Sequence, residues 1–305
     1  MLLAAGIGER MAPLSDLVAK PALEVLGAPL LASSLAHLRR CGCAPVVVNL
    51  HRHAEAVEAA AAVTAGDLPL AFSREPELLG SAGGIAAARA SFAPGPVLAA
   101  NADVWAELDL EPLIERASAG TIVLALMPHP DPQRWGAVKL DAGLVTAFLP
   151  PGGSAEGQPY LFTGFQIIGE QVLAELPEPP AQIQTVWRLL LAAGRLHGAV
   201  VRGAWREAGS PAAYLDLVLD LLGGAVWTHA EARVDPGARL ERTAVGRGCH
   251  VSVGSHLVDC VLTAGATVGP GCALQRCVVA GPVVLAGAGK ASDALFLPAG
   301  RYPLR

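Results

Sequence analysis

The sequence predicts two domains: an α/β domain with a mainly parallel sheet over residues 1–222, and a parallel β-helix over residues 226–305. Two observations support this prediction. In the first part, short runs of Val, Ile and Leu alternate with Ala-rich amphipathic segments, whereas the second part repeats one pattern every 17 residues. Because 52% of the 305 residues are hydrophobic, the chain has enough apolar material for both cores.

Three apolar runs are the clearest strands of the first domain. They are VVVNL at 46–50, VLAAN at 97–101 and TIVLALM at 121–127. Continuous Val/Ile/Leu runs are typical of strands that are buried on both faces, and their alternation with helical segments favours a parallel sheet. In such sheets, ligands bind at the carboxyl ends of the strands.

The second domain is predicted from three rows of 17 residues, 232–248, 249–265 and 266–282, which align column by column. One inward aliphatic residue every five or six positions, with a small residue at each corner, is what a three-sided parallel β-helix requires. The pattern resembles the left-handed β-helix of hexapeptide-repeat proteins, and a fourth row is expected to decay into a polar cap. The four matched columns are Val234, Val251 and Val268; Leu240, Leu257 and Leu274; Val245, Leu262 and Val279; and Gly237, Gly254 and Gly271.

Polar and sulfur-containing residues of the repeat are predicted to be structural. Cys260 and Cys277 share a column and are expected to be small, partly buried fillers. His250 and His256 invite comparison with hexapeptide acyltransferases, in which a His acts as general base. Because those enzymes usually have more coils and an inserted loop, both His are predicted to be outward polar residues. The β-helix is expected to pack against the first domain or to mediate formation of a homo-oligomer.

The overall charge and the cysteines exclude several classes of protein. A net charge of -5 with 22 Lys plus Arg argues against a nucleic-acid partner and favours small molecules. The six cysteines form no CxxC pair, so we expect reduced thiols. Neither a basic segment before an apolar stretch nor a run of 18 apolar residues occurs, and we therefore expect a cytoplasmic protein without membrane association.

The segment LLAAGIGERMAPLSDLVAKPAL, residues 2–23, predicts a phosphate-binding loop. Gly6 and Gly8 after an apolar strand let backbone N–H groups approach phosphate oxygens, and Arg10 and Lys20 can neutralise the phosphate charge. The dinucleotide fingerprint would require a third glycine and an immediate helix, and the P-loop would require GK[ST]; neither is present. Taken alone, the two glycines could equally form an ordinary strand-to-loop turn.

Four motifs in order resemble those of the nucleotidyltransferases that make sugar nucleotides. The opening segment is similar to G-x-G-x-R-[LM]-x-P-L-[TS] followed by K-P-x-L, with Ala19 where the family usually has Pro. LLGSAGGI at 78–85 resembles the LGTAG nucleobase loop, NADVW at 101–105 the NGD motif, and WREAGSPAAYL at 205–215 the W-x-D-x-G-T-P-x-x-Y-L motif. The resemblance implies a Rossmann-like sheet domain with a short left-handed β-helix, as in mannose-1-phosphate guanylyltransferases, and it covers nearly the whole chain.

The resemblance implies transfer of a nucleotidyl group from a nucleoside triphosphate to a sugar 1-phosphate, giving an NDP-sugar and pyrophosphate. A sugar phosphate oxygen would attack the α-phosphorus in line, without a covalent nucleophile, so that catalysis would rest on positioning and charge neutralisation. Both guanine and uracil stay open as the base. The alternative is a non-catalytic, nucleotide-sugar-binding regulatory subunit of such an enzyme.

Roles for individual residues follow from the matched motifs. Arg10 and Lys20 would hold the triphosphate and stabilise the departing pyrophosphate, and Mg²⁺ would bridge Asp103 to the phosphates. Glu207 would be the second metal carboxylate, where the family usually has Asp. The residues implied in nucleotide binding are Ala4, Ala5, Gly6, Gly8, Gly80, Ala82, Gly83 and Asn101.

Several of these positions also have a purely structural interpretation. Asp103 could be a cap or turn residue at a strand end, and Glu207 could be a solvated surface residue. The Gly-rich residues 80–84 could be a flexible connection.

The sugar-binding side departs most from the family. VTAFLPPGG at 145–153 has Pro150 and Pro151 where many relatives have the Glu-Lys pair of F-x-E-K-P, whose Lys grips the sugar phosphate. FTGFQIIG at 162–169 is similar to the FSG-like strand of the N-acetylmuramate 1-phosphate uridylyltransferases, which also lack that pair. Thr163 and Gly164 are therefore predicted to bind the sugar, and no residue is assigned to its phosphate.

Overall fold

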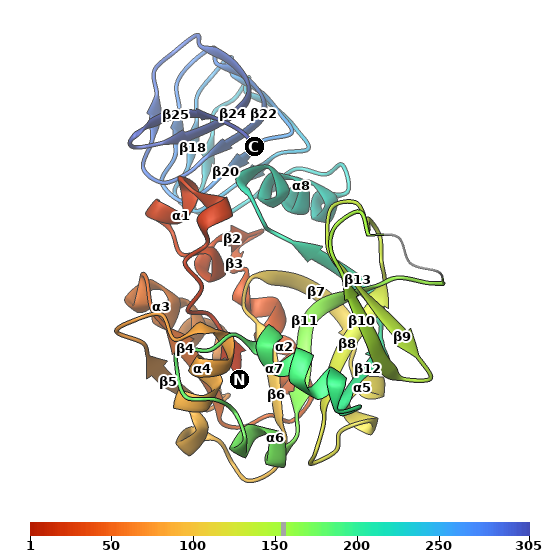
Figure 1. Cartoon of the computed structure of the whole chain (residues 1–305). Helices are drawn as coiled ribbons and strands as arrows, with labels where there is room; N and C mark the ends of the chain where they lie inside the picture. Colours follow the sequence, from red (N-terminus) through yellow and green to blue (C-terminus); the bar gives the residue numbers. More distant parts are fainter. Residues whose placement is uncertain (154–156) are drawn as a thin grey trace. The chain divides into compact units, whose positions relative to one another are not determined.

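The computed structural model describes residues 1–153 and 157–305. By their contacts, these residues form two compact units: Met1–Gly6 with Leu31–Trp205, and Ile7–Leu30 with Arg206–Arg305 (Figure 1). The predicted phosphate-binding loop is thus divided: its strand, within Met1–Gly6, belongs to the first unit, and the residues from Ile7 onward belong to the second. These units group residues by contact and not by order along the chain. The predicted domain boundary between residues 222 and 226 therefore stays a prediction.

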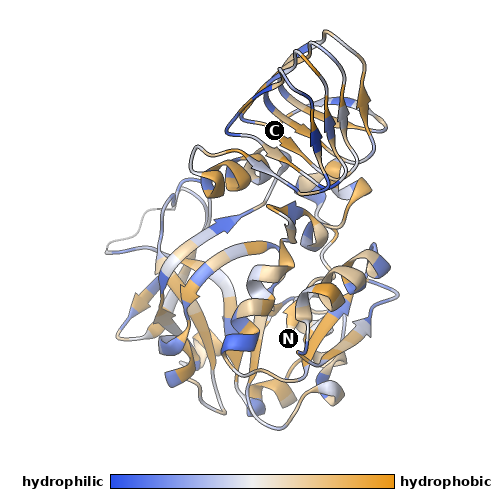
Figure 2. Cartoon of the chain, turned by 180° about the vertical axis from the view of Figure 1, so that it is seen from behind, coloured by the Kyte–Doolittle hydropathy of each residue, from blue (hydrophilic) through white to orange (hydrophobic). Residues whose placement is uncertain are grey.

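A nine-stranded sheet organises the first unit, in the order β5-β4-β1-β6-β11-β8-β12-β10-β9. Figure 2 shows hydrophobic residues along the strands beside the N-terminus. The strands are β1 (Leu2–Leu3), β4 (Val46–Leu50), β5 (Leu70–Arg74), β6 (Val97–Asn101), β8 (Ile122–Pro128), β9 (Ala137–Asp141), β10 (Leu144–Leu149), β11 (Tyr160–Ile168) and β12 (Leu196–Val200).

The α/β class is confirmed, and the parallel part of the sheet is β5-β4-β1-β6 together with the pair β8–β12. The remaining pairs are antiparallel, so the second half of the sheet is mixed rather than mainly parallel. One reason is the two-residue turn Ala142–Gly143 between β9 and β10, since so short a connection joins only antiparallel neighbours. The predicted strands at 46–50 and 97–101 are confirmed, and the third lies one residue later than predicted.

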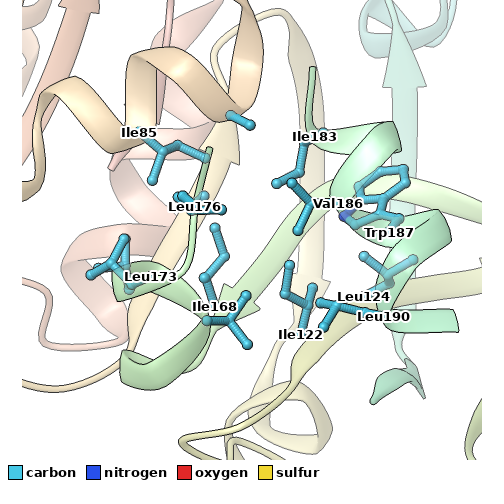
Figure 3. Close-up of a cluster of buried hydrophobic side chains, with 14 of the residues drawn as sticks. Ile85, Ile122, Leu124, Ile168, Leu173, Leu176, Ile183, Val186, Trp187 and Leu190 are labelled. Atoms are coloured by element: carbon cyan, nitrogen blue, oxygen red, sulfur yellow. The ribbon is translucent and has the colours of Figure 1, made fainter. Parts of the chain in front are cut away.

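Helices cover the sheet and close its core. Figure 3 shows side chains of α4, α6 and α7 meeting those of β8 and β11; Ile85, Ile122, Ile168 and Trp187 are among the buried residues of this cluster. The burial of this apolar surface stabilises the unit. The helices of the unit are α2 (Leu31–Arg40), α3 (Ala54–Ala65), α4 (Gly80–Ala87), α5 (Glu111–Glu115), α6 (Glu170–Ala174), α7 (Ile183–Ala192) and the 3₁₀ turn η3 (Arg89–Ser91). In the part of the chain that the structure describes, no helix is long and apolar enough to cross a membrane.

The second unit begins with short turns and a long helix. Ser210 caps helix α8 (Pro211–Leu222), since its hydroxyl accepts a hydrogen bond from the Ala213 N–H at 3.3 Å. The buried Tyr214 hydroxyl donates to the carbonyl oxygen of Glu24, and burial raises the pKa of Tyr214. The other elements are η1 (Glu9–Met11), α1 (Leu14–Leu17), η2 (Lys20–Ala22), the hairpin β2 (Glu24–Val25) with β3 (Ala28–Pro29), and β13 (Arg202–Glu207), which spans the boundary between the units.

The rest of the second unit is a parallel β-helix. Each strand pairs with the strand 17 residues later: Val234 with Val251 and Val268, and Leu240 with Leu257 and Leu274. The predicted aliphatic columns are therefore confirmed. The strands are β14 (Trp227–Thr228), β15 (Arg233–Val234), β16 (Arg239–Glu241), β17 (Ala244–Val245), β18 (His250–Val251), β19 (His256–Val258), β20 (Val261–Leu262), β21 (Thr267–Val268), β22 (Ala273–Val279), β23 (Val284–Leu285), β24 (Lys290–Leu297) and β25 (Gly300–Pro303).

Two predictions about the β-helix need correction. The fourth row forms a full coil, because β23 pairs with β21 and β24 pairs with β22; the cap is β25, which is antiparallel to β24. Cys260 and Cys277 are 0% exposed, so they are fully rather than partly buried. His250 and His256 are partly exposed and lie beside Asp235 and Glu241, as expected of outward polar residues.

Candidate active site

In the first unit, three neighbouring strands carry predicted site residues. Leu3 of β1 is in register with Asn101 of β6, and the Ala102 N–H donates to the Leu3 carbonyl oxygen at 3.0 Å. The residues after β1 and those after β6 therefore lie side by side. Asp103 stands in the turn between β6 and β7 (Val104–Asp109) and is half-buried. The structure thus brings together Ala4, Ala5, Gly6, Asn101 and Asp103 at the carboxyl edge of the sheet.

Gly164 lies against Asn101 from the adjacent strand β11. Its φ is +90°, which favours glycine, and a Cβ at this position would be 3.2 Å from Cβ of Asn101, so a larger residue would be strained and would press on Asn101. Thr163 is buried, and its hydroxyl donates to the Ala125 carbonyl oxygen at 3.0 Å. Its own carbonyl oxygen accepts from Trp205 Nε1 at 2.9 Å. Gly164 therefore adjoins the nucleotide-binding candidates, while the Thr163 hydroxyl is engaged within the sheet.

The segment predicted as a nucleobase loop or flexible connection is instead helix α4. The N–H groups of Ala82 and Gly83 both donate to the Ala181 carbonyl oxygen at 3.0 Å. A Cβ on Gly80, whose φ is +74°, would be 2.5 Å from that same oxygen. The glycines thus allow close packing against the segment before α7. A role of Gly80, Ala82 and Gly83 in nucleotide binding stays a prediction.

A buried polar network behind these residues was not predicted from the sequence. Asn49 Oδ1 accepts from the Ala4 N–H at 2.8 Å, and Asn49 Nδ2 donates to Glu75 Oε1 at 2.7 Å. Glu75 Oε2 accepts from the Leu79 N–H at 3.0 Å, next to the start of α4. Both side chains are buried and hydrogen-bonded, as buried polar groups require. The one sequence feature that indicates this network is the polar Asn49 inside the apolar run VVVNL.

In the second unit, Gly8 is the point on which the phosphate-loop segment folds. Its φ is +67°, in the left-handed region that favours glycine. A Cβ here would lie 3.4 Å from Cβ of Ser15 and 3.8 Å from Cβ of Lys20. Two 3₁₀ turns then carry the predicted cations: Arg10 lies in η1, and Lys20 begins η2.

Glu207 holds these two cations. Its Oε1 lies 2.6 Å from Arg10 Nη2 and 4.0 Å from Lys20 Nζ. The Lys20 side chain is 7% exposed and that of Glu207 15%, whereas that of Arg10 is 69% exposed. Because a buried ammonium requires an anionic or hydrogen-bonding neighbour, the carboxylate is part of this cluster and not a solvated surface residue.

The two carboxylates predicted to bind a divalent cation are Asp103 and Glu207, and this role stays a prediction. Among residues 1–153 and 157–305, no group of three or more His, Cys, Asp or Glu side chains could hold a metal by itself. Mg²⁺ is usually bound through one or two carboxylates, with phosphate oxygens and water completing its shell. Asp103 in the first unit and Glu207 in the second are each a carboxylate of this kind.

The fold and the sequence together define a nucleotidyl-transferring protein: the sequence profile of the Nucleotidyl transferase family matches residues 1–223, and the chain belongs to this family. Among its relatives, the mannose-1-phosphate guanylyltransferase of Mycobacterium tuberculosis is 28% identical over 302 residues, which cover 90% of this chain and 82% of the relative. The N-acetylmuramate alpha-1-phosphate uridylyltransferase of Caulobacter vibrioides is 32% identical over 235 residues, covering 70% of this chain and 93% of the relative.

Solved structures show the same fold. HddC from Yersinia pseudotuberculosis aligns with a TM-score of 0.62 at 20% identity, over 72% of this chain and 97% of that protein. The same protein has also been solved in complex with GMP-PN. Enzymes of this kind work with a divalent metal ion.

Proposed function

We propose that this protein transfers a nucleotidyl group, guanylyl or uridylyl, from a nucleoside triphosphate to a sugar 1-phosphate in nucleotide-sugar biosynthesis. The observation that carries the proposal is the cluster of Arg10, Lys20 and Glu207 around the Gly8 turn, in a chain of the Nucleotidyl transferase family. In the reaction, an oxygen of the sugar phosphate forms a bond to the α-phosphorus. The bond from the α-phosphorus to the bridging oxygen breaks, and pyrophosphate leaves with that electron pair.

Arg10 and Lys20 are proposed to bind the triphosphate and to stabilise the leaving pyrophosphate. The Arg10 side chain is largely exposed and therefore available to a phosphate, whereas Lys20 is held in a nearly buried position. Phosphate oxygens form stronger charge-assisted hydrogen bonds with a guanidinium than water does. We expect the phosphates to replace Glu207 as the anionic partner of Arg10.

Asp103 and Glu207 are the proposed ligands of the divalent cation, which we take to be Mg²⁺. When bound, the cation neutralises phosphate charge. If Arg10 binds the phosphates instead of Glu207, the Glu207 carboxylate becomes available to bind the cation. The longer Glu side chain, where the family usually has Asp, is compatible with a carboxylate that alternates between two partners.

The nucleotide is proposed to contact the ends of β1 and β6 through Ala4, Ala5, Gly6, Gly8 and Asn101, and α4 through Gly80, Ala82 and Gly83, with Thr163 and Gly164 on the sugar side. GTP with mannose 1-phosphate is the first substrate pair to test. The mannose-1-phosphate guanylyltransferase of Mycobacterium tuberculosis aligns with 90% of this chain, so the alignment includes the β-helix. UTP with N-acetylmuramate 1-phosphate is the second pair.

The test is a turnover panel of four nucleoside triphosphates against several sugar 1-phosphates, followed by pyrophosphate release with and without EDTA. We expect release only when a sugar 1-phosphate, GTP or UTP, and a divalent cation are all present. Binding of a nucleotide sugar without turnover for any pair would instead identify a regulatory subunit.

We also propose that residues 1–222 form the catalytic domain and residues 226–305 the β-helix domain of a cytoplasmic homo-oligomer. The second part stacks coils of similar sequence, and the oligomer is proposed to form through this β-helix. Light scattering coupled to gel filtration measures the oligomeric state, and a monomer at all concentrations would contradict it.

A further inference from the structure

The segment Asp131–Gly136 lies directly against Pro150–Gly153, both in the first unit. The Gly152 N–H donates to the Pro132 carbonyl oxygen at 2.9 Å. A Cβ on Gly136 would be 2.8 Å from the Leu149 carbonyl oxygen, so the two backbones touch here. This contact places Arg134 in a segment that packs beside Pro151, the position at which many relatives carry the lysine for the sugar phosphate.

Hydrogen bonds fix the backbone around Arg134. The N–H groups of Gln133 and Arg134 both donate to Asp131 Oδ1 at 3.2 Å. His129 Nδ1 accepts from the Asp131 N–H at 3.1 Å, and its Nε2 lies 3.2 Å from the Gly136 carbonyl oxygen. The segment is thus a braced turn, and Arg134 projects from a defined position on it.

Aromatic contacts connect Arg134 to the predicted sugar-binding strand. The Arg134 guanidinium lies over the Trp135 ring, 4.7 Å from its centroid, and Trp135 meets Trp205 edge-on with the centroids 6.0 Å apart. Trp205 Nε1 donates to the carbonyl oxygen of Thr163, the residue before Gly164. A continuous series of contacts within one unit therefore runs from Arg134 to the candidate sugar site.

We propose that Arg134 binds the phosphate of the sugar 1-phosphate, in place of the lysine that this chain lacks at Pro151. The inference rests on the proposed function and names the substrate contact which that function leaves open. A guanidinium can donate two parallel hydrogen bonds to a phosphate, and stacking on Trp135 orients its planar face beforehand. The Arg134 side chain is exposed and so accessible to a dissolved substrate.

The experiment compares Arg134→Ala with the wild type by binding and by kinetics. Tryptophan fluorescence reports binding of mannose 1-phosphate and of free mannose, and pyrophosphate release reports KM for both substrates. We expect Arg134→Ala to weaken mannose 1-phosphate binding and to raise its KM by about 10- to 100-fold, the effect of losing a charge-assisted hydrogen bond. KM for the nucleoside triphosphate and binding of free mannose should stay within about 2-fold.

Three further variants separate the interpretations. Arg188→Ala, on an exposed face of α7, is the matched control and should leave every parameter unchanged. Arg134→Lys keeps the charge but loses the two parallel donors, and its KM for mannose 1-phosphate should lie between those of the wild type and Arg134→Ala. An unchanged KM and unchanged binding of mannose 1-phosphate in Arg134→Ala would overturn the proposal. A rise in KM for Lys139→Ala with none for Arg134→Ala would assign the phosphate to the neighbouring strand β9 instead.

Failure of this inference differs from failure of the proposed function. If the wild-type protein binds mannose 1-phosphate but releases no pyrophosphate, only the enzymatic function is contradicted, and the binding comparison still tests Arg134. If neither mannose 1-phosphate nor any other sugar 1-phosphate binds more tightly than its free sugar, the assignment of Arg134 is wrong.

Discussion

The two units hold their candidate site residues in different ways. In the first, buried polar side chains fix the backbone: Asn49 and Glu75 tie the end of β1 to the start of α4 through three hydrogen bonds. In the second, charges hold one another, because Glu207 neutralises Arg10 and Lys20. The backbone of the first unit is therefore held in place before a ligand binds. In the second unit, the cations are paired with a carboxylate, which a phosphate can replace.

The largest expected effect comes from Asp103, the half-buried carboxylate of the sheet unit. We predict that Asp103→Asn lowers pyrophosphate release by more than about 1000-fold without changing the melting temperature, because it removes the charge that a divalent cation requires and keeps the shape. Asp141→Asn, at the exposed end of strand β9, is the control and should stay fully active. Activity of Asp103→Asn above about a tenth of wild type would refute the metal role.

Next in size are the cations of the second unit. Arg10→Ala and Lys20→Ala should each lower kcat by about 100-fold, the scale of one lost charge at a transition state. Steady-state kinetics with the nucleoside triphosphate as the varied substrate measures both parameters. A rise in KM with unchanged kcat would mean that the residue binds the ground state alone.

The β-helix tests whether the second unit depends on apolar stacking as well as on charge. Val251 is 0% exposed and lies between Val234 and Val268, whereas Val253, two residues later, is 54% exposed. Val251→Asp should lower the free energy of unfolding by about 3–5 kcal/mol and change the elution volume, since it buries a charge without a partner.

The same substitution at Val253 should cost less than about 0.5 kcal/mol. Thermal melts of the two variants give the comparison, and any nucleotide binding that survives in Val251→Asp should keep a similar affinity. Equal melting temperatures would mean that the aliphatic columns do not face a core.

The smallest expected effect is a pH dependence in the sheet unit. Burial lowers the pKa of His37, whose Nδ1 lies 2.8 Å from the Ser33 carbonyl oxygen and whose Nε2 accepts from the Leu108 N–H at 3.0 Å. The folded state therefore favours the neutral ring, and the unfolded state binds the proton first as the pH falls below about 6.5.

Stability should consequently drop below that pH, by at most about 1.4 kcal/mol per pH unit from this group. Urea midpoints at pH 7.5 and 5.5 measure the effect. The difference between the two midpoints should shrink in His37→Gln, and an equal difference in both proteins would contradict the assignment.

Sequence patterns predicted the β-helix better than the surroundings of the site. Each inward residue of a coil recurs 17 positions later, so Val251 and Leu257 could be placed in the core from spacing alone. The non-glycine residues in left-handed conformation at one corner carry no such compositional signal and were not predicted. These residues are Arg242, Asp259, Arg276 and Asp293.

Contacts between distant segments explain what the sequence left open. Helix α4 forms despite three glycines, which have low helix propensity, because Ala181 from a segment about 100 residues later accepts its N–H groups. Likewise, the motifs predicted both Arg10 and Glu207 as site residues, but nothing in the sequence indicated that they pair across 197 positions. The motifs thus predicted the candidate site residues, and the structure shows which side chains they contact.

The central claim is that the α-phosphorus moves to the sugar phosphate, and isotope labelling tests it directly. With GTP or UTP, whichever the panel selects, labelled at the α-phosphorus, the wild-type protein and a sugar 1-phosphate should place the label in the NDP-sugar. With the γ-phosphorus labelled, the label should appear in pyrophosphate. Recovery of the α-label only in a nucleoside monophosphate or in unreacted triphosphate would contradict the claim.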